Sequence, residues 1–385
     1  MKPELRWLKP DILQETESIQ GMAMRIAVLY GGKSGEHEVS LRSAASVVRN
    51  LDKSHKLHLI GITRHGAWHL QPDSVLADCL EGDLPLDLRS DAPVVLVVPG
   101  TGLRVYGARG SADLPLDVVF PVLHGTFGED GTVQGLLECA DLAYVGADVL
   151  GSAVGMDKEM AKTIWKSVGL PIVPSITATT SDLKEMDTLA SRVESVLGWP
   201  VFVKPARGGS SVGASKVDNR SGLESAAQKA LLCDTKILIE PFIHGKEIEC
   251  SVLGNENPRA FPPGEIVPSH EYYDYEAKYI DPDGAALLIP AELDESSRNR
   301  IMEIAVSAYS AAGMSGMARV DFFIDKSNGT IYLNEANTIP GFTSISMYPK
   351  MCEAGGLPYP ALLDELLSLA VGRKKSRAAL HYDRV

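Results

Sequence analysis

Two short runs of alternating residues near the end of the chain constrain its fold most. Residues 318–325 and 330–337 alternate apolar and polar side chains, the pattern of half-buried β-strands. Asn328 and Gly329 between them form a strong turn signal. A three-residue loop, 327–329, with Gly329 in the left-handed conformation would join the two runs into an antiparallel hairpin. This hairpin is the most specific structural prediction that the chain offers.

The predicted hairpin brings charged side chains together on one face. In that register Asp321 lies opposite Glu335, and Arg319 lies opposite Asn337. Two carboxylates that face each other across a sheet repel, so a purely structural interpretation must account for that cost. A divalent cation removes the repulsion, because carboxylate and amide oxygens are hard ligands suited to Mg²⁺ or Mn²⁺. We therefore predict that Asp321, Glu335 and Asn337 bind metal.

The start of the chain has the pattern of an open α/β domain. Residues 25–30 form an apolar run that ends in a glycine pair, and a helical pattern and a second strand at 56–63 follow. Strand, helix and strand in this order predict a βαβ unit within residues 24–146. The segment that continues through Lys33 is not a P-loop, because Ala27 stands six residues before the lysine, where that motif needs a glycine.

The rest of the chain divides into further units, as its 385 residues allow. Residues 147–243 combine strands, helices and a glycine loop, which predicts a small α+β domain. Residues 244–373 are rich in strands and contain the hairpin and closing helices. Residues 374–385 are basic and irregular, which predicts a tail. Residues 1–23 form a polar extension that lacks the apolar core of a signal peptide.

The overall charge argues against two classes of partner. A formal net charge of −13 does not attract nucleic acid or anionic membranes, so we expect neither. No apolar run approaches the roughly 20 residues needed to span a bilayer. The five cysteines are scattered and contain no C-x-x-C pair, which predicts reduced thiols in a cytoplasmic protein. Anionic ligands must then be held by local clusters of Lys, Arg and backbone N–H groups.

A lysine followed by a glycine–serine loop predicts a phosphate site. Lys204 lies at the end of an apolar strand, and the loop 208–213 follows it. Successive exposed N–H groups in such a loop cradle phosphate oxygens, and the lysine adds a positive charge. A flexible surface turn is the less favoured alternative. Further along, Glu240 and Glu247 either remain solvated at strand ends or accept hydrogen bonds from an adenine amino group and a ribose diol.

Three further segments each allow a structural and a functional interpretation. His124 follows a strand at 117–123 among glycines, so it is either a structural histidine or lies at the strand edge where open α/β sheets bind ligands. Ser346 precedes a predicted helix, where it caps the helix, binds a carboxylate, or does both. Residues 270–279 carry four tyrosines among charges, either as an exposed interaction loop or as a lid that brings Lys278 to a phosphate.

Seven segments spread over residues 24–372 are similar to the motifs of the D-alanine–D-alanine ligase family, in that family's order. They are 31–40, 124–131, 156–158, Lys204 with 209–213, 273–279, 319–321 and 334–341. Each segment is weak or moderate evidence by itself, but seven in sequence are highly specific. The resemblance implies an α/β (α+β) fold, the three-domain ATP-grasp architecture, with an open α/β domain at the N-terminus. It places ATP between the central and C-terminal domains, with D-alanine sites facing the N-terminal domain.

The resemblance also implies a role for each residue that matches a family motif. ATP would be bound by Lys158, Lys204, Ser210, Ser211, Val212, Gly213 and Lys278 at its phosphates, and by Glu240 and Glu247 at its adenosine. Two Mg²⁺ (or Mn²⁺) ions would be bound by Asp321, Glu335 and Asn337. The D-alanine sites and the reacting groups would be served by Glu36, His124, Ser210, Tyr279, Arg319, Gly341, Ser346 and the Met347 N–H.

The implied activity is the ATP-dependent joining of two D-alanines for peptidoglycan synthesis, and the implied assembly is a homodimer. Two differences from the family stand out: Pro241 occupies a position where some members have lysine, and the leader before Met24 has no counterpart. A ligase that makes D-alanyl-D-lactate or D-alanyl-D-serine is one alternative. A non-catalytic nucleotide-binding regulator on the same fold is another, although an intact Arg319 beside the metal ligands argues against it.

Overall fold

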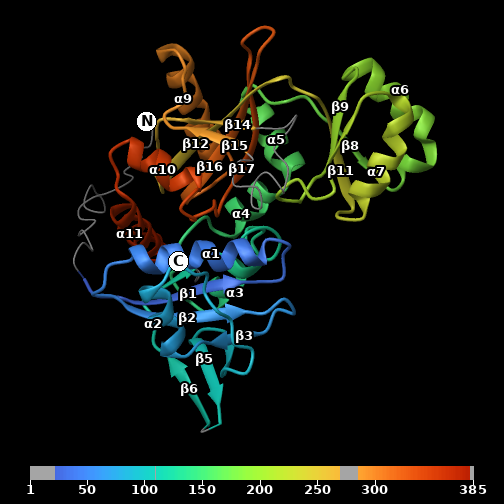
Figure 1. The fold of residues 1–385 in the computed structure, drawn as a ribbon. Coiled ribbons are helices and arrows are strands. Elements are labelled where there is room, and N and C mark those ends of the chain that lie inside the picture. The colour runs from blue at the N-terminus through green and yellow to red at the C-terminus, as the bar shows by residue number, and fades with distance from the viewer. Residues whose placement is uncertain (1–21, 109, 269–284, 382–385) are drawn as a thin grey trace, which may run out of the picture.

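The computed structural model describes residues 22–108, 110–268 and 285–381, which form three β-sheets surrounded by helices. Figure 1 shows the seven-stranded sheet at one end of the molecule, the six-stranded sheet beyond it and the four-stranded sheet to one side. The predicted α/β class is confirmed. Over these ranges no helix is both long enough and apolar enough to cross a bilayer.

The N-terminal sheet has the strand order β6-β5-β4-β3-β2-β1-β7. Its strands are β1 (Arg25–Gly31), β2 (Lys56–Ile62), β3 (Trp68–Leu70), β4 (Val94–Val98), β5 (Gly102–Gly107), β6 (Gly110–Leu114) and β7 (Val118–Pro121). β1 runs parallel to both β2 and β7 and lies between them, so its residues 26–30 are fully buried. Helix α1 (His37–Asn50) connects β1 to β2, which confirms the βαβ prediction.

The parallel arrangement of β1 and β7 brings two loops to one edge of this sheet. The glycine turn after β1 leads through Glu36 into α1, and the segment after β7 contains His124. The Ser34 hydroxyl joins the two loops by donating to the His124 carbonyl oxygen (2.6 Å). Ligands of open α/β sheets bind outside the carboxyl ends of strands, and both residues lie there. Helices α2 (Asp73–Glu81) and α3 (Thr132–Cys139) complete this part.

The four-stranded sheet is antiparallel, with the order β10-β9-β11-β8. Its strands are β8 (Ile176–Thr179), β9 (Val201–Pro205), β10 (Ser215–Val217) and β11 (Lys236–Pro241), and its apolar core includes residues of α6 (Met186–Val196) and α7 (Leu223–Leu231). The apolar pattern of residues 171–176 also predicts a strand, but the strand found there, β8, begins only at Ile176. Pro171 and Pro174 remove two backbone donors, and the segment makes only an isolated bridge at Ile172 before β8 begins.

The six-stranded sheet has the order β15-β14-β12-β16-β17, with β13 paired to β12. Its strands are β12 (Gly245–Gly254), β13 (Arg259–Ala260), β14 (Gly264–Pro268), β15 (Ala285–Leu288), β16 (Gly316–Asp325) and β17 (Ile331–Asn337). Helices α5 (Lys158–Ser167) and α9 (Glu295–Ala311) share its apolar core, where Trp165 donates to the Ala308 carbonyl oxygen (2.9 Å). Helix α4 (Val149–Met156) leads into α5.

The β16–β17 hairpin has the predicted register at its functional end. Both predicted pairs are confirmed: Arg319 with Asn337 and Asp321 with Glu335. The turn differs from the prediction, because four residues separate Asp325 from Thr330, whose carbonyl oxygen accepts from the Asp325 N–H (3.0 Å). An irregularity after Asp321 then shifts the register back by one residue. Gly329 is left-handed, as predicted, with φ of 73°.

The chain ends in α10 (Met347–Ala354) and α11 (Tyr359–Ala378). The prediction that residues 374–385 form an irregular tail is therefore wrong for the part up to Ala378. The helix continues because its basic side chains have partners in the N-terminal part: Lys374 Nζ lies 3.4 Å from Asp141 Oδ1, and Arg377 pairs with Glu138. The basic composition reflects this contact rather than a solvated end.

Candidate active site

One cleft of about 950 Å³ collects the predicted site residues from all three sheets. Among the described residues, those that line it are Glu36, His124, Lys158, Lys204, Ser210, Ser211, Val212, Glu240, Glu247, Arg319, Asp321, Glu335, Asn337, Gly341, Ser346 and Met347. Gly213 does not line the cleft and instead lies against Cys233. Lys278 and Tyr279 fall outside the described residues. In the part of the chain that the structure describes, motifs far apart in the sequence thus meet in a single space.

Three neighbouring strands contribute an acidic row of carboxylates: Glu249 from β12, Asp321 from β16 and Glu335 from β17, which lie opposite one another. Arg319 donates to both oxygens of Asp321, from Nε (2.8 Å) and Nη2 (2.7 Å). Asn337 Nδ2 also donates to Asp321 (2.9 Å). No group of three His, Cys, Asp or Glu side chains in the described ranges is arranged as a metal site by itself. The oxygen donors predicted to bind metal are the facing carboxylates of Asp321 and Glu335 and the side-chain amide of Asn337.

A second ionic group, the lysine cluster, consists of Lys162, Lys204 and Glu240. The two oxygens of Glu240 lie 2.9 Å from Lys162 Nζ and 2.7 Å from Lys204 Nζ. Burial would raise the pKa of Glu240, but the two lysines more than offset it and hold that pKa below its ordinary value. Lys162, only 2% exposed, is missing from the sequence prediction, because a helix position gives no sign that a lysine is buried.

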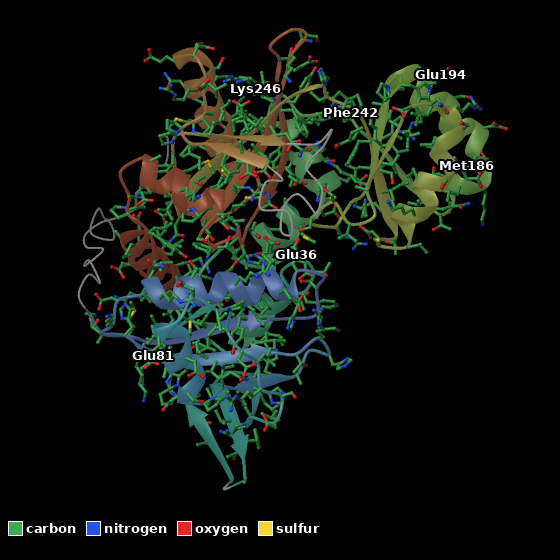
Figure 2. The ribbon with its side chains drawn as sticks, in the orientation of Figure 1. Glu36, Glu81, Met186, Glu194, Phe242 and Lys246 are labelled. Atoms are coloured by element: carbon green, nitrogen blue, oxygen red, sulfur yellow. The ribbon has the colours of Figure 1, made fainter. Side chains whose placement is uncertain are left out.

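The predicted phosphate loop reaches across to the N-terminal part of the molecule. The Ser210 hydroxyl donates to Glu36, and Lys158 Nζ donates to the Gly208 carbonyl oxygen (2.6 Å). A Cβ at Gly209 would lie 2.8 Å from Glu36 Oε1, so a larger residue there would displace this carboxylate. Ser210 and Ser211 are both left-handed, with φ of 49° and 58°, a strained backbone typical of functional loops. Figure 2 shows Glu36 where the N-terminal part meets the others.

Both ring nitrogens of His124 have partners within the protein. Nδ1 lies 3.0 Å from the Ile339 carbonyl oxygen, and Nε2 lies 3.0 Å from Ser43 Oγ. Burial lowers the pKa of His124, which keeps the ring neutral. Since the carbonyl can only accept, Nδ1 carries the proton and Nε2 accepts from Ser43, whose oxygen in turn accepts from the Phe342 N–H (3.3 Å). These contacts favour the structural interpretation, in which His124 positions the loop that contains Gly341.

Glu129 is a site residue that the sequence analysis did not single out. Its two oxygens accept hydrogen bonds from the Gly125 N–H (2.7 Å) and the Ile339 N–H (3.0 Å), which joins the N-terminal and C-terminal walls of the cleft. Burial, together with the nearby Glu36 carboxylate, raises the pKa of Glu129 to about 8. The sequence does contain a signal for Glu129, because it is an acid within the glycine-rich segment 124–131. Within this segment only His124 is predicted as a candidate site residue.

The loop before α10 has a compact polar turn. Ser346 occupies the N-cap position of α10, but its side chain does not cap that helix. Its oxygen accepts from the Thr343 N–H (2.9 Å) and lies 2.8 Å from the Thr343 hydroxyl. A Cβ at Gly341 would lie 2.6 Å from Ser346 Oγ, so a larger residue there would force the serine hydroxyl to move. The N-terminus of α10 thus faces the cleft with its backbone donors and a serine hydroxyl.

Comparisons with known proteins assign the chain to a family. The family model described as D-ala D-ala ligase N-terminus matches residues 25–147, and the one described as D-ala D-ala ligase C-terminus matches residues 164–368. A D-alanine–D-alanine ligase from Treponema denticola is 53% identical over 358 residues, which are 92% of this chain and 97% of that relative.

Two solved structures agree with the sequence matches. The D-alanine–D-alanine ligase from Coxiella burnetii superimposes with a TM-score of 0.79 at 39% identity, over 92% of this chain and 96% of that one. A D-Ala:D-Ser ligase from Enterococcus faecalis gives a TM-score of 0.78 at 36% identity, over 91% of this chain and all of that one. The chain therefore has the ATP-grasp fold and belongs to the D-alanine–D-alanine ligase family.

Proposed function

We propose that the protein carries out the reaction of its family: it joins two D-alanines into D-alanyl-D-alanine for peptidoglycan synthesis and converts ATP to ADP and phosphate. The observation that supports this most is the single cleft in which a lysine cluster, a strained glycine–serine loop and an acidic row face one another. We place the reaction in the cytoplasm and expect a homodimer. We also propose that residues 24–146, 147–243 and 244–373 fold as the three domains.

The lysine cluster and the loop 208–213 would bind the nucleotide. Lys158 and Lys204 neutralise phosphate oxygens, and the loop that contains Ser210 covers them. ATP competes with Glu240 for Lys204, and Lys162 keeps Glu240 paired when Lys204 turns to the phosphates. Glu240 can then accept from the adenine amino group while Glu247 accepts from the ribose hydroxyls, and Lys278 would reach a phosphate.

The acidic row provides oxygen donors for a divalent cation. Asp321, Glu335 and Asn337 would hold two Mg²⁺ or Mn²⁺ ions, and two facing carboxylates with an adjacent amide fit such hard cations. Phosphate oxygens and waters would complete the coordination, which explains why the protein donors alone are few. The bound cations would neutralise charge on the transferred phosphoryl group.

The remaining residues of the cleft would bind the two amino acids. Glu36, with Ser210 and Tyr279, holds the ammonium of the first D-alanine. The carboxylate of this D-alanine attacks the γ-phosphate, the bond to the β-phosphate oxygen breaks, and an acylphosphate and ADP result. Ser346 and the Met347 N–H hold the carboxylate of the second D-alanine.

The second step forms the peptide bond. The amine of the second D-alanine attacks the acylphosphate, and phosphate leaves. Arg319 and the Gly341 N–H stabilise the oxyanion of this step. The site must exclude water, which would otherwise hydrolyse the acylphosphate.

One comparison favours a second candidate, since the Enterococcus faecalis relative is a D-Ala:D-Ser ligase. In that case the first D-alanine would be activated in the same way, and D-serine would occupy the site near Ser346. The difference between the two candidates lies only in the second subsite. Supplying D-serine or D-lactate with D-alanine separates the candidates, and a mixed product as the main species would favour the alternative.

The direct test supplies purified protein with ATP, Mg²⁺ and either D-alanine or L-alanine, and measures phosphate and dipeptide. We expect one phosphate released for each D-alanyl-D-alanine formed, with no dipeptide from the L-isomer. Phosphate release that D-alanine does not stimulate, or an absence of dipeptide, would contradict the proposal. A regulator without ligase activity would bind ATP and give neither product.

A further inference from the structure

The acidic row contains one carboxylate that the proposed reaction does not use. Glu249 pairs with Asp321 on the side of β16 away from β17, whereas Glu335 and Asn337 both come from β17. Glu249 is only 6% exposed. A buried carboxylate beside another one is costly unless it has a specific partner of opposite charge. The role of Glu249 therefore depends on what it contacts.

Glu249 contacts the guanidinium of Arg319. Glu249 Oε2 lies 3.1 Å from Arg319 Nε, and this same N–H lies 2.8 Å from Asp321 Oδ1. The Nε hydrogen bond goes to Asp321, and Glu249 Oε2 stays within ion-pair distance of the same nitrogen. Asp321 also accepts from Nη2 (2.7 Å), and thus holds the planar fork in the structure described. Glu249 is the second acceptor within reach.

We propose that Glu249 is a positioning residue that holds the Arg319 guanidinium in place when the oxygens of Asp321 turn to a nucleotide-bound cation. The inference rests on the proposed function. A cation bound by Asp321 would draw on the carboxylate oxygens and weaken their hydrogen bonds to Arg319. The charge of Glu249, 3.1 Å from Nε, would then keep the guanidinium directed at the oxyanion of the second step.

Two other roles for Glu249 can be compared with this geometry. A third cation ligand is one of them, because Glu249 and Glu335 are both direct cross-strand neighbours of Asp321, and cation affinity separates that role from the proposed one. A purely structural acid would balance Arg319 equally well at any stage of the reaction. The proposed role differs from both, because it affects peptide-bond formation and leaves acylphosphate formation intact.

The test compares phosphate release with dipeptide formation in Glu249→Gln and Glu249→Ala. A displaced Arg319 slows attack by the second amine, and water then attacks the waiting acylphosphate and returns D-alanine and phosphate. We expect dipeptide formation to fall about 10–100-fold in Glu249→Ala, with more than one phosphate released per dipeptide. Glu249→Gln keeps an oxygen acceptor and should fall less. The KM for ATP should stay within about twofold in both variants.

The matched control is Glu365→Ala, which removes the carboxylate of another Arg–Glu pair. Glu365, on α11, lies 2.6 Å from Arg259 on β13, and neither residue lines the cleft. The rates of phosphate release and dipeptide formation, and their ratio, should therefore equal those of the original protein. If Glu249→Ala does not fold, as thermal melting would show, Glu249→Gln alone decides the result.

Three outcomes would overturn the inference. If phosphate release and dipeptide formation fall together, so that one phosphate is still released per dipeptide, Glu249 has only a structural role. A tenfold weaker Mn²⁺ affinity of Glu249→Gln in the presence of ADP, followed by electron paramagnetic resonance, would make Glu249 a cation ligand. No dipeptide from the unsubstituted protein would overturn the proposed function itself, and this is measured before any variant.

Discussion

The lysine cluster and the acidic row are both buried ionic groups in one cleft, but among the described residues cations predominate in one and carboxylates in the other. The lysine cluster has two cations around Glu240, whereas the acidic row has three carboxylates around Arg319. Lys158 lies between them, 3.3 Å from Glu335. Unbalanced buried charge is unfavourable without a ligand of opposite sign. We propose that anionic phosphates complete one end of the cleft and cations the other.

The largest expected effect comes from removing the central carboxylate of the acidic row. Asp321→Ala deprives both the cations and Arg319 of a partner, so dipeptide formation should fall on the order of 10³–10⁵ in kcat. The conservative control is Asp325→Asn on the same strand, where the carboxylate only hydrogen-bonds the turn. If kcat of Asp321→Ala decreases by less than about tenfold, the acidic row does not take part in the reaction.

The next effect separates the two lysines of the lysine cluster. Lys162→Met leaves the buried Glu240 with one partner, and the free energy of unfolding should fall by about 3–5 kcal/mol. Lys204→Met should destabilise less, because Lys204 is the more exposed of the two, but it should weaken ATP binding more. Urea denaturation measures the free energy of unfolding of both variants, and nucleotide titration measures their affinity for ATP. Equal effects of the two substitutions on both quantities would contradict the division of roles.

The hairpin illustrates how far sequence reasoning succeeded. The alternation of residues 318–325 and 330–337 predicted which side chains share a face, and the structure agrees. The functional register was right although the predicted loop was one residue too short, because the irregularity after Asp321 restores the same pairing. Local pattern determines which face a side chain takes, but the length of a turn and the place of a bulge depend on packing.

The residues that the sequence did not identify share one property. Lys162, Glu129 and Glu249 are ionisable groups whose partners lie far away in the chain, on another element. Burial of a charged residue depends on such partners, and composition by itself predicts exposure. The same reason explains the wrong prediction of an irregular end, where α11 is stabilised by contacts with Glu138 and Asp141.

A smaller effect concerns Glu129, which is close enough to Glu36 and Arg319 for both charges to act on it. Its pKa is raised from 4.5 to about 8, so the folded protein keeps a proton that the unfolded chain releases. Its contribution to stability is therefore present below about pH 4.5 and is lost as the pH rises through about 8. The free energy of unfolding of Glu129→Gln should lack this dependence on pH.

The measurement is the difference in unfolding free energy between Glu129→Gln and the original protein. Between pH 6 and about pH 7.5 it should change by about 1 kcal/mol per pH unit in favour of the variant. Parallel pH profiles would show that Glu129 is ionised in the folded protein at neutral pH.

The smallest effect is expected outside the cleft, at an exposed pair. Arg259 and Glu365 are bidentate at 2.6 and 2.7 Å, but Arg259 is half exposed. Such pairs contribute about 0.2–1 kcal/mol, so Glu365→Ala should lower stability by less than about 1 kcal/mol and should leave activity unchanged. A loss as large as that of Lys162→Met would show that burial is not what distinguishes the clusters in the cleft.

The most direct test of the charge complementarity of the cleft is Mn²⁺ binding, followed by electron paramagnetic resonance with and without ADP. We predict that ADP strengthens Mn²⁺ binding, because the lysine cluster holds phosphates beside the acidic row, and that Asp321→Ala and Glu335→Gln abolish this while Glu249→Gln retains it. Mn²⁺ binding that is indifferent to ADP, or that survives both Asp321→Ala and Glu335→Gln, would contradict the account.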